Sequence, residues 1–262
     1  MPKLRLVQVD AFADRPFAGN PAAVVPLEEW LRDETLQAIA EENNLSETAF
    51  TVPTAGDADY ELRWFTPTTE VALCGHATLA SGHVLIAGER VRFRTRKAGL
   101  LEVRRAGSGG YELDLPETLV EPAVHDELLA ALGTPRAEVF LSCKGAEATA
   151  IVLVADEAAV RACAPDMGRL RHIELMAIVT APGQRHDVVS RVFVPAWGVD
   201  EDPVTGSAHA ALTPFWCERL GADSFTAWQA SRRGGLVHCR RAGDRAVLGG
   251  NCITVIEGIL SF

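Results

Sequence analysis

The chain has 262 residues, 48% of them hydrophobic and 23% charged, which is typical of a folded globular protein and excludes a disordered or fibrous one. Its formal net charge of −10 argues against a binder of nucleic acids or anionic membranes, which would present a basic surface. The sequence holds no run of 18 apolar residues, and its N-terminal segment favours a strand over a signal peptide. The six cysteines lack C-x-x-C spacing. We therefore expect a cytoplasmic enzyme with reduced thiols.

In chain order, the first half alternates short strands with two helices. Alternating apolar residues predict its strands, at 3–9, 23–27, 48–52, 60–65, 91–95, 100–104 and 111–115. Leu36, Ile39 and Ala40 predict an amphipathic helix over 33–42. The small apolar residues of 76–87 predict a buried helix that ends at Gly88. Consecutive strands with few crossover helices favour the α+β class.

The sequence repeats itself once. Residues 63–67 (RWFTP) match 191–195 (RVFVP) at an offset of 128, and 75–80 match 206–211 at an offset of 131. Residues 95–107 match 231–243 at an offset of 136, with seven identities in 13 positions. Because order and spacing are both kept, we expect two pseudo-symmetric lobes, each a mixed β-sheet or barrel around a central helix.

The lobes are predicted to span 1–118 and 119–262. The proline-containing segment from Pro116 to Pro122 is the expected joint between them. The second central helix is predicted over 208–219. The lobe to which the final strand, 252–260, belongs is open, since this strand could cross back to the first lobe.

Each repeat places a glycine directly before its central helix, Gly75 in the first lobe and Gly206 in the second. A helix N-terminus offers unpaired N–H groups and a partial positive charge to an anion. Two such termini would face each other across an interlobe cleft, which is a common type of ligand site. The alternative is that these glycines simply begin well-packed helices.

Three further residues could carry chemistry, each with a structural alternative. Glu47 could be a general base if it were partly desolvated, or a surface turn residue. Asp202 could contact substrate or cap the second central helix. His76 could donate to a substrate oxygen or be a buried structural histidine.

Cys74 could be a thiolate favoured by the helix N-terminus, or a small buried apolar residue. A two-thiol racemase would need a second cysteine just before Gly206, where the sequence has DPVT instead, and Cys217 is eleven residues too late. Phosphate-binding, dinucleotide-binding, serine-hydrolase and zinc-protease motifs are absent, so the sequence implies no metal and no cofactor.

Four motifs together resemble the PhzF family of phenazine biosynthesis-like isomerases, which share their fold with diaminopimelate epimerase. The motifs are VDAF at 9–12 with FAGNP at 17–21, NLSET at 44–48, LCGHAT at 73–78, and EDPVTGSA at 201–208. They follow the family order along nearly the whole chain.

The resemblance implies a homodimer that acts without cofactor on a small carboxylate-bearing molecule in the interlobe cleft. It implies that Glu47 is the catalytic acid/base and that five residues hold the substrate: Gly75, His76, Asp202, Gly206 and Ser207. Cys74 and Asn20 are further possible site residues. The phenazine enzymes themselves usually have a small residue at the position of Cys74.

The sequence therefore predicts a cofactor-independent, PhzF-like isomerase in which Glu47 moves a proton. Two alternatives are kept. One is an epimerase or racemase that pairs the Cys74 thiol with a carboxylate, and the other is a non-catalytic small-molecule binder on the same fold.

Overall fold

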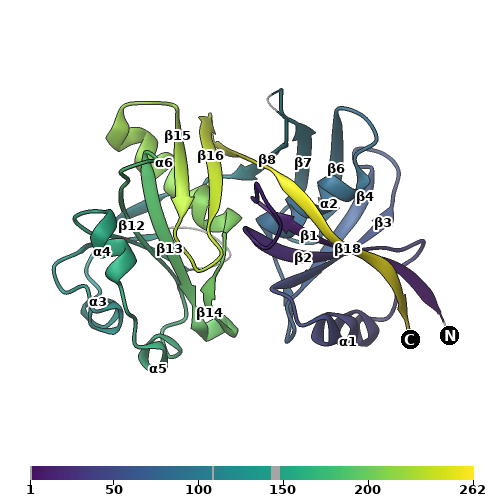
Figure 1. The fold of residues 1–262 in the computed structure, drawn as a ribbon, viewed down its shortest axis with the longest axis horizontal. Coiled ribbons are helices and arrows are strands. Elements are labelled where there is room, and N and C mark those ends of the chain that lie inside the picture. Colours follow the sequence, from purple (N-terminus) through teal and green to yellow (C-terminus); the bar gives the residue numbers. More distant parts are fainter. Residues whose placement is uncertain (1, 108, 143–147) are drawn as a thin grey trace. The chain divides into compact units, whose positions relative to one another are not determined.

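The computed structural model describes residues 2–107, 109–142 and 148–262. The chain forms two compact units (Figure 1), unit 1 from Met1–Leu115 with Gly249–Phe262, and unit 2 from Pro116–Leu248. The first boundary between the units lies directly before the proline-containing segment 116–122, and the chain returns to unit 1 at Gly249.

Unit 1 holds both ends of the chain. Its elements are β1 (Lys3–Ala11), β2 (Asn20–Pro26), α1 (Asp33–Asn43), β3 (Glu47–Pro53), β4 (Tyr60–Phe65), β5 (Glu70–Val71), α2 (Gly75–Leu85), β6 (Arg90–Thr95), β7 (Leu100–Arg105), β8 (Tyr111–Pro116) and β18 (Cys252–Ser261). The final strand β18 pairs antiparallel with β1 from Lys3↔Ser261 to Ala11↔Cys252, so it belongs to the first lobe's sheet.

Unit 2 is built from the elements that lie between β8 and β18 in the sequence. These are β9 (Val120–Ala123), α3 (Asp126–Leu132), β10 (Glu138–Ser142), β11 (Thr149–Leu153), α4 (Glu157–Ala162), α5 (Met167–Leu170), β12 (Met176–Pro182), β13 (Val188–Val194), the 3₁₀ turn η1 (Pro195–Trp197), β14 (Val199–Asp202), α6 (Gly206–Leu220), β15 (Ser224–Gln229), β16 (Gly235–Ala242) and β17 (Arg245–Gly250).

The strand pairings of the two units follow one plan. In unit 1, β1 pairs antiparallel with β2, β2 parallel with β3, β3 antiparallel with β4, and β4 parallel with β6. In unit 2, the same sequence of pairings runs through β10, β11, β12, β13 and β15. The structure and its relatives described below confirm the predicted α+β fold with duplicated lobes.

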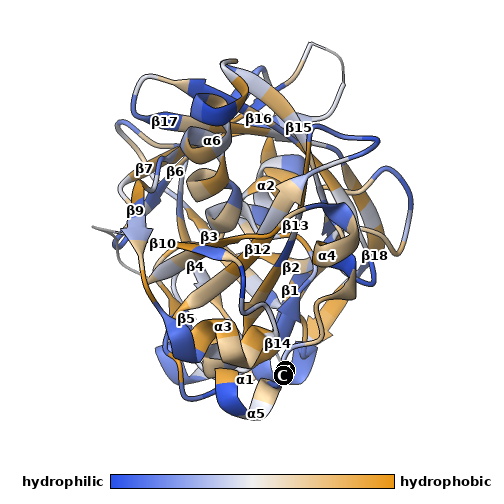
Figure 2. Ribbon diagram, turned by 90° about the vertical axis from the view of Figure 1, so that its left-hand side faces the viewer, coloured by the Kyte–Doolittle hydropathy of each residue, from blue (hydrophilic) through white to orange (hydrophobic). Residues whose placement is uncertain are grey.

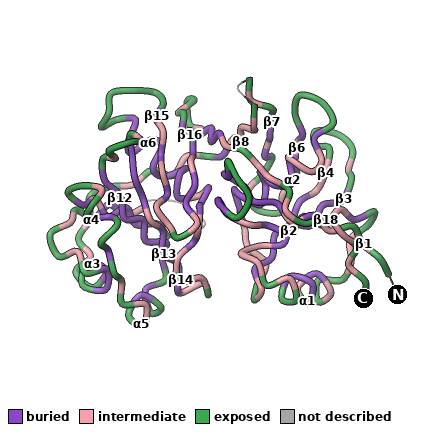
Figure 3. Tube along the Cα trace, viewed as in Figure 1, coloured by how far each residue is buried: buried purple, intermediate pink, exposed green. Residues whose placement is uncertain are grey.

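The central helix of each unit, α2 in unit 1 and α6 in unit 2, is surrounded by the strands of that unit. The first eight residues of α2 are all buried, and so is nearly the whole of α6. Small residues let α2 pack closely against the strands. At Gly82, for example, a Cβ would lie 2.4 Å from the Val103 side chain. Hydrophobic residues colour strands such as β3 and β12 orange in Figure 2, and exposed residues gather in loops and at the chain ends in Figure 3.

Some element ends differ from the predictions. The α2 helix begins at Gly75 and ends at Leu85, before the predicted stop at Gly88, because Ile86 turns to extended backbone and buries its side chain. The β2 strand begins at Asn20, since its pairing with β1 continues to Ala11↔Asn20. No helix in the described part of the chain is long and apolar enough to cross a membrane.

An arginine closes the loop that precedes each central helix, and it is buried in unit 1 and 15% exposed in unit 2. In unit 1, Arg63 makes two 2.8 Å hydrogen bonds to the Glu70 carboxylate and lies over the Phe65 ring at 5.0 Å. In unit 2, Arg191 makes bonds of 2.8 and 3.0 Å to Glu201 and lies over Phe193 at 4.9 Å. These bidentate pairs hold β5 and β14, the last elements before the helices.

The polar side chains of the central helices bond back to the helix itself. Thr78 donates to the carbonyl of Cys74 at 2.6 Å, and the imidazole Nδ1 of His209 donates to the equivalent carbonyl of Thr205 at 2.7 Å. The other ring nitrogen of His209, Nε2, is buried without a hydrogen-bond partner in the described residues. Burial lowers the pKa of His209 to about 4.

Breaking the Arg63–Glu70 pair is expected to destabilise the protein. Glu70→Ala removes two hydrogen bonds from the buried guanidinium and leaves it Asp33, at 2.8 Å, as its remaining carboxylate partner among the described residues, which should lower the free energy of unfolding by about 2 kcal/mol in urea titrations at neutral pH. Glu257→Ala is the matched control, because its pair with Arg5 is exposed and should contribute less than about 1 kcal/mol. Equal losses in the two variants would contradict the structural role of the buried pair.

The buried His209 should make stability depend on pH. Its pKa is below the ordinary value, so the unfolded chain binds the extra proton and stability falls as pH drops from 6.5 towards 4. His209→Thr copies Thr78 and removes this titration. The stability advantage of wild type over His209→Thr should shrink by about 3 kcal/mol between pH 7 and pH 4 in urea titrations. An advantage that does not change with pH would show that His209 is not buried in the neutral form.

Candidate functional site

Glu47 is the first residue of β3, where its backbone pairs in parallel register with Ala22 of β2. The turn before it is tight, because Asn44 ends α1 in the left-handed conformation, with φ of 48°. The Glu47 side chain is only 16% exposed. The structure therefore places this carboxylate inside unit 1 and not on a surface turn.

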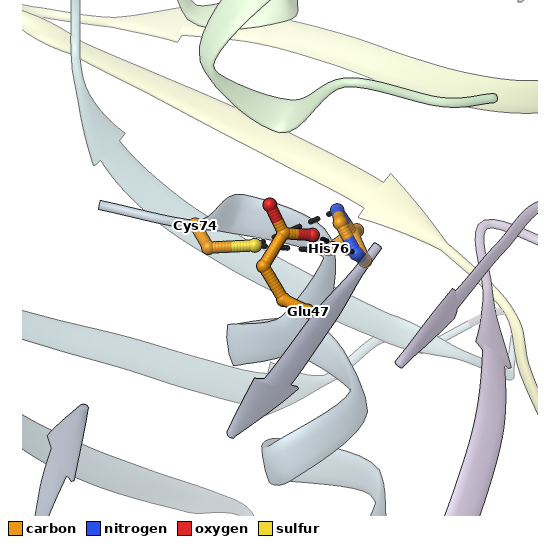
Figure 4. A group of neighbouring side chains, drawn as sticks. All are labelled: Glu47, Cys74 and His76. Carbon is orange, nitrogen blue, oxygen red and sulfur yellow. Dashed lines mark hydrogen bonds and ion pairs between the residues drawn. The ribbon is translucent and has the colours of Figure 1, made fainter. Parts of the chain in front are cut away.

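The Glu47 carboxylate lies against the imidazole of His76 (Figure 4). Oε2 of Glu47 is 3.0 Å from Nε2 of His76, the second residue of α2, whose side chain is 4% exposed. Oε2 is nevertheless buried without an aligned hydrogen bond from the described residues. A desolvated carboxylate oxygen that lacks such a bond is a better proton acceptor than a hydrogen-bonded one.

Asn20 contacts the opposite side of the imidazole. Its Nδ2 lies 3.1 Å from Nδ1 of His76, and the residue is completely buried. The loop before it is tightly held, because Asp10 accepts a 2.7 Å bond from the N–H of Phe17. Gly19 has φ of +63°, and a Cβ there would lie 2.2 Å from a carbonyl oxygen of β1. This loop therefore fixes the position of the Asn20 backbone, from which the side chain reaches His76.

Cys74 is the N-cap residue of α2 and is buried. Its Sγ lies 3.5 Å from Nδ1 and 4.0 Å from Nε2 of His76. Burial raises the pKa of the thiols of Cys163, Cys217 and Cys239, which favours their inert protonated form. Cys74 differs from these three by its place at a helix N-terminus beside a carboxylate and an imidazole.

Glu47, Cys74 and His76 are residue types that bind transition metals, and their ligand atoms lie within 4.8 Å of one another. The sulfur, however, is nearly equidistant from the two ring nitrogens, so it lies beside the ring and not along either lone pair. An ion about 2.0 Å from Nε2 would therefore be well beyond a zinc–sulfur bond of about 2.3 Å. The arrangement fits a proton-transfer site better than a metal site.

The N-terminus of α2 adds positive potential to this group. Gly75 and His76 are its first two residues, and the first turn contains no acidic side chain. An eleven-residue helix directs its unpaired N–H groups towards this end, where a carboxylate would be stabilised. Unit 1 thus brings together five predicted site residues, Asn20, Glu47, Cys74, Gly75 and His76.

The remaining predicted residues lie in unit 2, at the start of α6. The Asp202 carboxylate is buried and accepts a short hydrogen bond from the hydroxyl of Thr205, the N-cap residue. Gln229 supports both residues. Its Oε1 accepts from the Thr205 N–H at 2.9 Å, and its Nε2 donates to the Asp202 carbonyl at 2.7 Å.

Gln229 is a residue that the sequence analysis missed. It occupies an inward position of β15, where the other buried positions are Phe225 and Ala227. A glutamine at an inward position of an alternating strand was the signal that could have identified it, since buried amides are kept when they have partners.

Gly206 and Ser207 begin α6, as Gly75 and His76 begin α2. The Ser207 hydroxyl donates to Sδ of Met176 at 3.8 Å. Met176 begins β12 directly before the residue that pairs with Phe193, as Glu47 begins β3 directly before the residue that pairs with Phe65. The Glu47–His76 contact of unit 1 thus has an equivalent in unit 2, made by two residues that do not titrate.

The model for the PhzC-PhzF family, described as phenazine biosynthesis-like protein, matches residues 9–258. An uncharacterized isomerase of Pseudomonas aeruginosa is 51% identical over 98% of this chain and 99% of the relative. The crystal structure of a PhzF family protein from Enterococcus faecalis is 42% identical, covers 100% of both chains and superimposes with a TM-score of 0.90.

A protein of Pseudomonas aeruginosa described as a predicted epimerase shares the fold at 21% identity, with a TM-score of 0.75 over 98% of this chain and 99% of that one. These comparisons confirm the predicted family and the predicted enzyme class, an isomerase. The chain belongs to the PhzC-PhzF family of phenazine biosynthesis-like proteins.

Proposed function

We propose that this isomerase moves a proton on a small carboxylate-bearing substrate without a cofactor, and that Glu47 is its general acid/base. The observation that carries the proposal is the buried Glu47 oxygen, 3.0 Å from His76 at the N-terminus of α2 and without an aligned hydrogen bond from the described residues. The catalytic role of Glu47 also agrees with the family resemblance.

In this mechanism Glu47 takes a proton from a carbon atom that conjugation has made acidic. The C–H bond breaks, its electron pair is delocalised into the conjugated system, and Glu47 returns the proton to a different carbon. One carboxylate thus acts first as base and then as acid, which contributes about 10²- to 10⁴-fold to the rate. His76 and the N–H groups of the α2 N-terminus stabilise the negative charge that develops.

The substrate class follows from the positive ends of the two central helices. Gly75 and His76 begin α2, and Gly206 and Ser207 begin α6, so each helix offers N–H groups to a carboxylate oxygen. Asp202 is the fifth substrate-binding residue of the proposal, and the bonds from Thr205 and Gln229 support its position. A homodimer remains a prediction from the resemblance, and a cytoplasmic location remains a prediction from the composition of the chain.

A second candidate is an epimerase that uses the Cys74 thiol together with a carboxylate. The position of Cys74 at the N-cap of α2, 3.5 Å from the His76 ring, favours it. The equivalent N-cap in α6 is Thr205, and the residue equivalent to Glu47 is Met176, so unit 2 supplies neither a matching thiol nor a matching carboxylate. This difference between the units makes the one-carboxylate mechanism the first choice.

Wild type should catalyse exchange of a substrate proton with solvent, and Glu47→Gln should not. Cyclic and acyclic carboxylates are incubated in heavy water and followed by proton NMR. The variant should exchange at least about 100-fold more slowly, because the amide cannot accept the proton. Glu42→Gln is the matched control, since Glu42 is an exposed glutamate of nearby α1.

Exchange lost in Glu47→Gln and kept in Glu42→Gln would support the assigned base. Equal exchange in Glu47→Gln and wild type would contradict it. Binding of a carboxylate that neither protein exchanges would favour the non-catalytic binder.

Cys74→Ser separates the two chemical mechanisms. If Glu47 is the acid/base, the serine variant should keep exchange within about 10-fold of wild type, since it changes only a neighbour of the His76 ring. The same NMR assay and optical rotation follow the reaction. Abolished exchange, together with racemisation by wild type only, would favour the thiol mechanism instead.

A further inference from the structure

The imidazole of His76 is held between two polar groups of opposite character. On one side Nδ1 lies 3.1 Å from the amide nitrogen of Asn20. On the other side Nε2 lies 3.0 Å from a carboxylate oxygen of Glu47. A neutral imidazole carries one N–H, and its neighbours decide which nitrogen has it.

The Sγ of Cys74, 3.5 Å from Nδ1, lies beside the ring and not along a lone pair, so Asn20 and Glu47 decide the tautomer, and both select the same one. An amide NH₂ group only donates, so Nδ1 must offer its lone pair to Asn20 and carries no proton. A carboxylate oxygen repels a lone pair, so Nε2, the nitrogen beside Glu47, carries the proton. We infer that Asn20 is a positioning residue that fixes His76 as the Nε2–H tautomer.

The position of Asn20 suits this role. The residue is completely buried at the first position of β2, paired with Ala11 of β1. The loop before it is fixed by the left-handed Gly19 and by the bond from the Phe17 N–H to Asp10. A rigid backbone on one side and a buried ring on the other leave the amide little freedom to rotate.

The inference rests on the proposed function, because a fixed tautomer matters chemically only if His76 acts beside the proton that Glu47 moves. With Nε2–H fixed, His76 can donate to a substrate oxygen, while the lone pair of Nδ1 is held by Asn20, so the imidazole does not compete with Glu47 as a base. Glu47 then remains the acceptor when substrate arrives, and the imidazole N–H stabilises the charge that develops.

The tautomer can be measured without any substrate. Long-range ¹H–¹⁵N correlation spectra of histidine-labelled protein at neutral pH distinguish a protonated from an unprotonated ring nitrogen, and the signals lost in His76→Gln assign residue 76. We expect Nε2 protonated and Nδ1 unprotonated in wild type. A wild-type protein with the proton on Nδ1 would overturn the inference, whatever the result for Glu47→Gln.

Asn20→Asp tests the cause. Aspartate has the shape of asparagine but only accepts, so Nδ1 of His76 should become protonated. Asn43→Asp is the matched control, because it adds the same charge near Glu47. The amide of Asn43 donates to the hydroxyl of Thr48 at 3.1 Å, and this hydroxyl can rotate to donate to an aspartate instead. The control should keep the Nε2–H tautomer. An unchanged His76 tautomer in folded Asn20→Asp would overturn the inference.

The activity of the same variants gives a second readout. On any carboxylate that wild type exchanges, Asn20→Asp should lower kcat by at least about 100-fold with a smaller change in KM, as expected for a residue with the wrong tautomer. Asn43→Asp should stay within about 3-fold of wild type. A loss in KM alone would mean that Asn20 serves binding and not the tautomer.

Discussion

A helix buried on every side must satisfy its polar groups within itself and present few large side chains, and this constraint shapes both units. In α2, Thr78 and Ser81 bond carbonyls one turn back, and Gly82 leaves room for Val103. In α6, Thr213 does the same. Apart from Nε2 of His209, the described polar side chains of the two helices can then pack against the surrounding strands with their hydrogen bonds made. The N-terminus, where the helix itself supplies no acceptors for the first N–H groups, is the end suited to a charged ligand.

The α6 helix shows how closely this constraint is met. Pro214 lies within the helix and cannot donate to the carbonyl of Ala210. The N–H of Thr118 donates to that carbonyl at 3.2 Å instead. The segment after β8 is therefore held against α6 by a bond that the proline makes available.

Duplication preserved the framework and changed the chemistry. The Arg63–Glu70 and Arg191–Glu201 pairs, with their phenylalanine contacts, hold the loops before α2 and α6 in the same way. At the equivalent site positions, a carboxylate, an imidazole and a thiol in unit 1 correspond to a thioether and two hydroxyls in unit 2. At these three equivalent positions, the titratable groups are therefore all in unit 1, which agrees with the proposal that a single residue both removes and returns a proton.

Much of this organisation could be predicted from the sequence, because the repeat kept its order. The offset grows from 128 to 131 where unit 2 inserts the three-residue turn η1, and it grows again where α6 is four residues longer than α2. The arginine pairs could not be predicted, since their spacing is 7 residues in one unit and 10 in the other. The contacts of Asn20 with His76 and of Gln229 with Asp202 could not be predicted either, because the two residues of each pair are far apart in sequence. Asn20 was named only as a possible site residue.

If Glu47 carries the same proton from one carbon to another, an isotope placed on the first carbon should reach the second within a single turnover. A substrate deuterated at the carbon that loses its proton would be converted in ordinary water, and the product analysed by mass spectrometry and NMR. With Glu47 as both base and acid, part of the product should carry deuterium at the new carbon. Product free of deuterium from the first turnover, while the remaining substrate is still fully labelled, would contradict it.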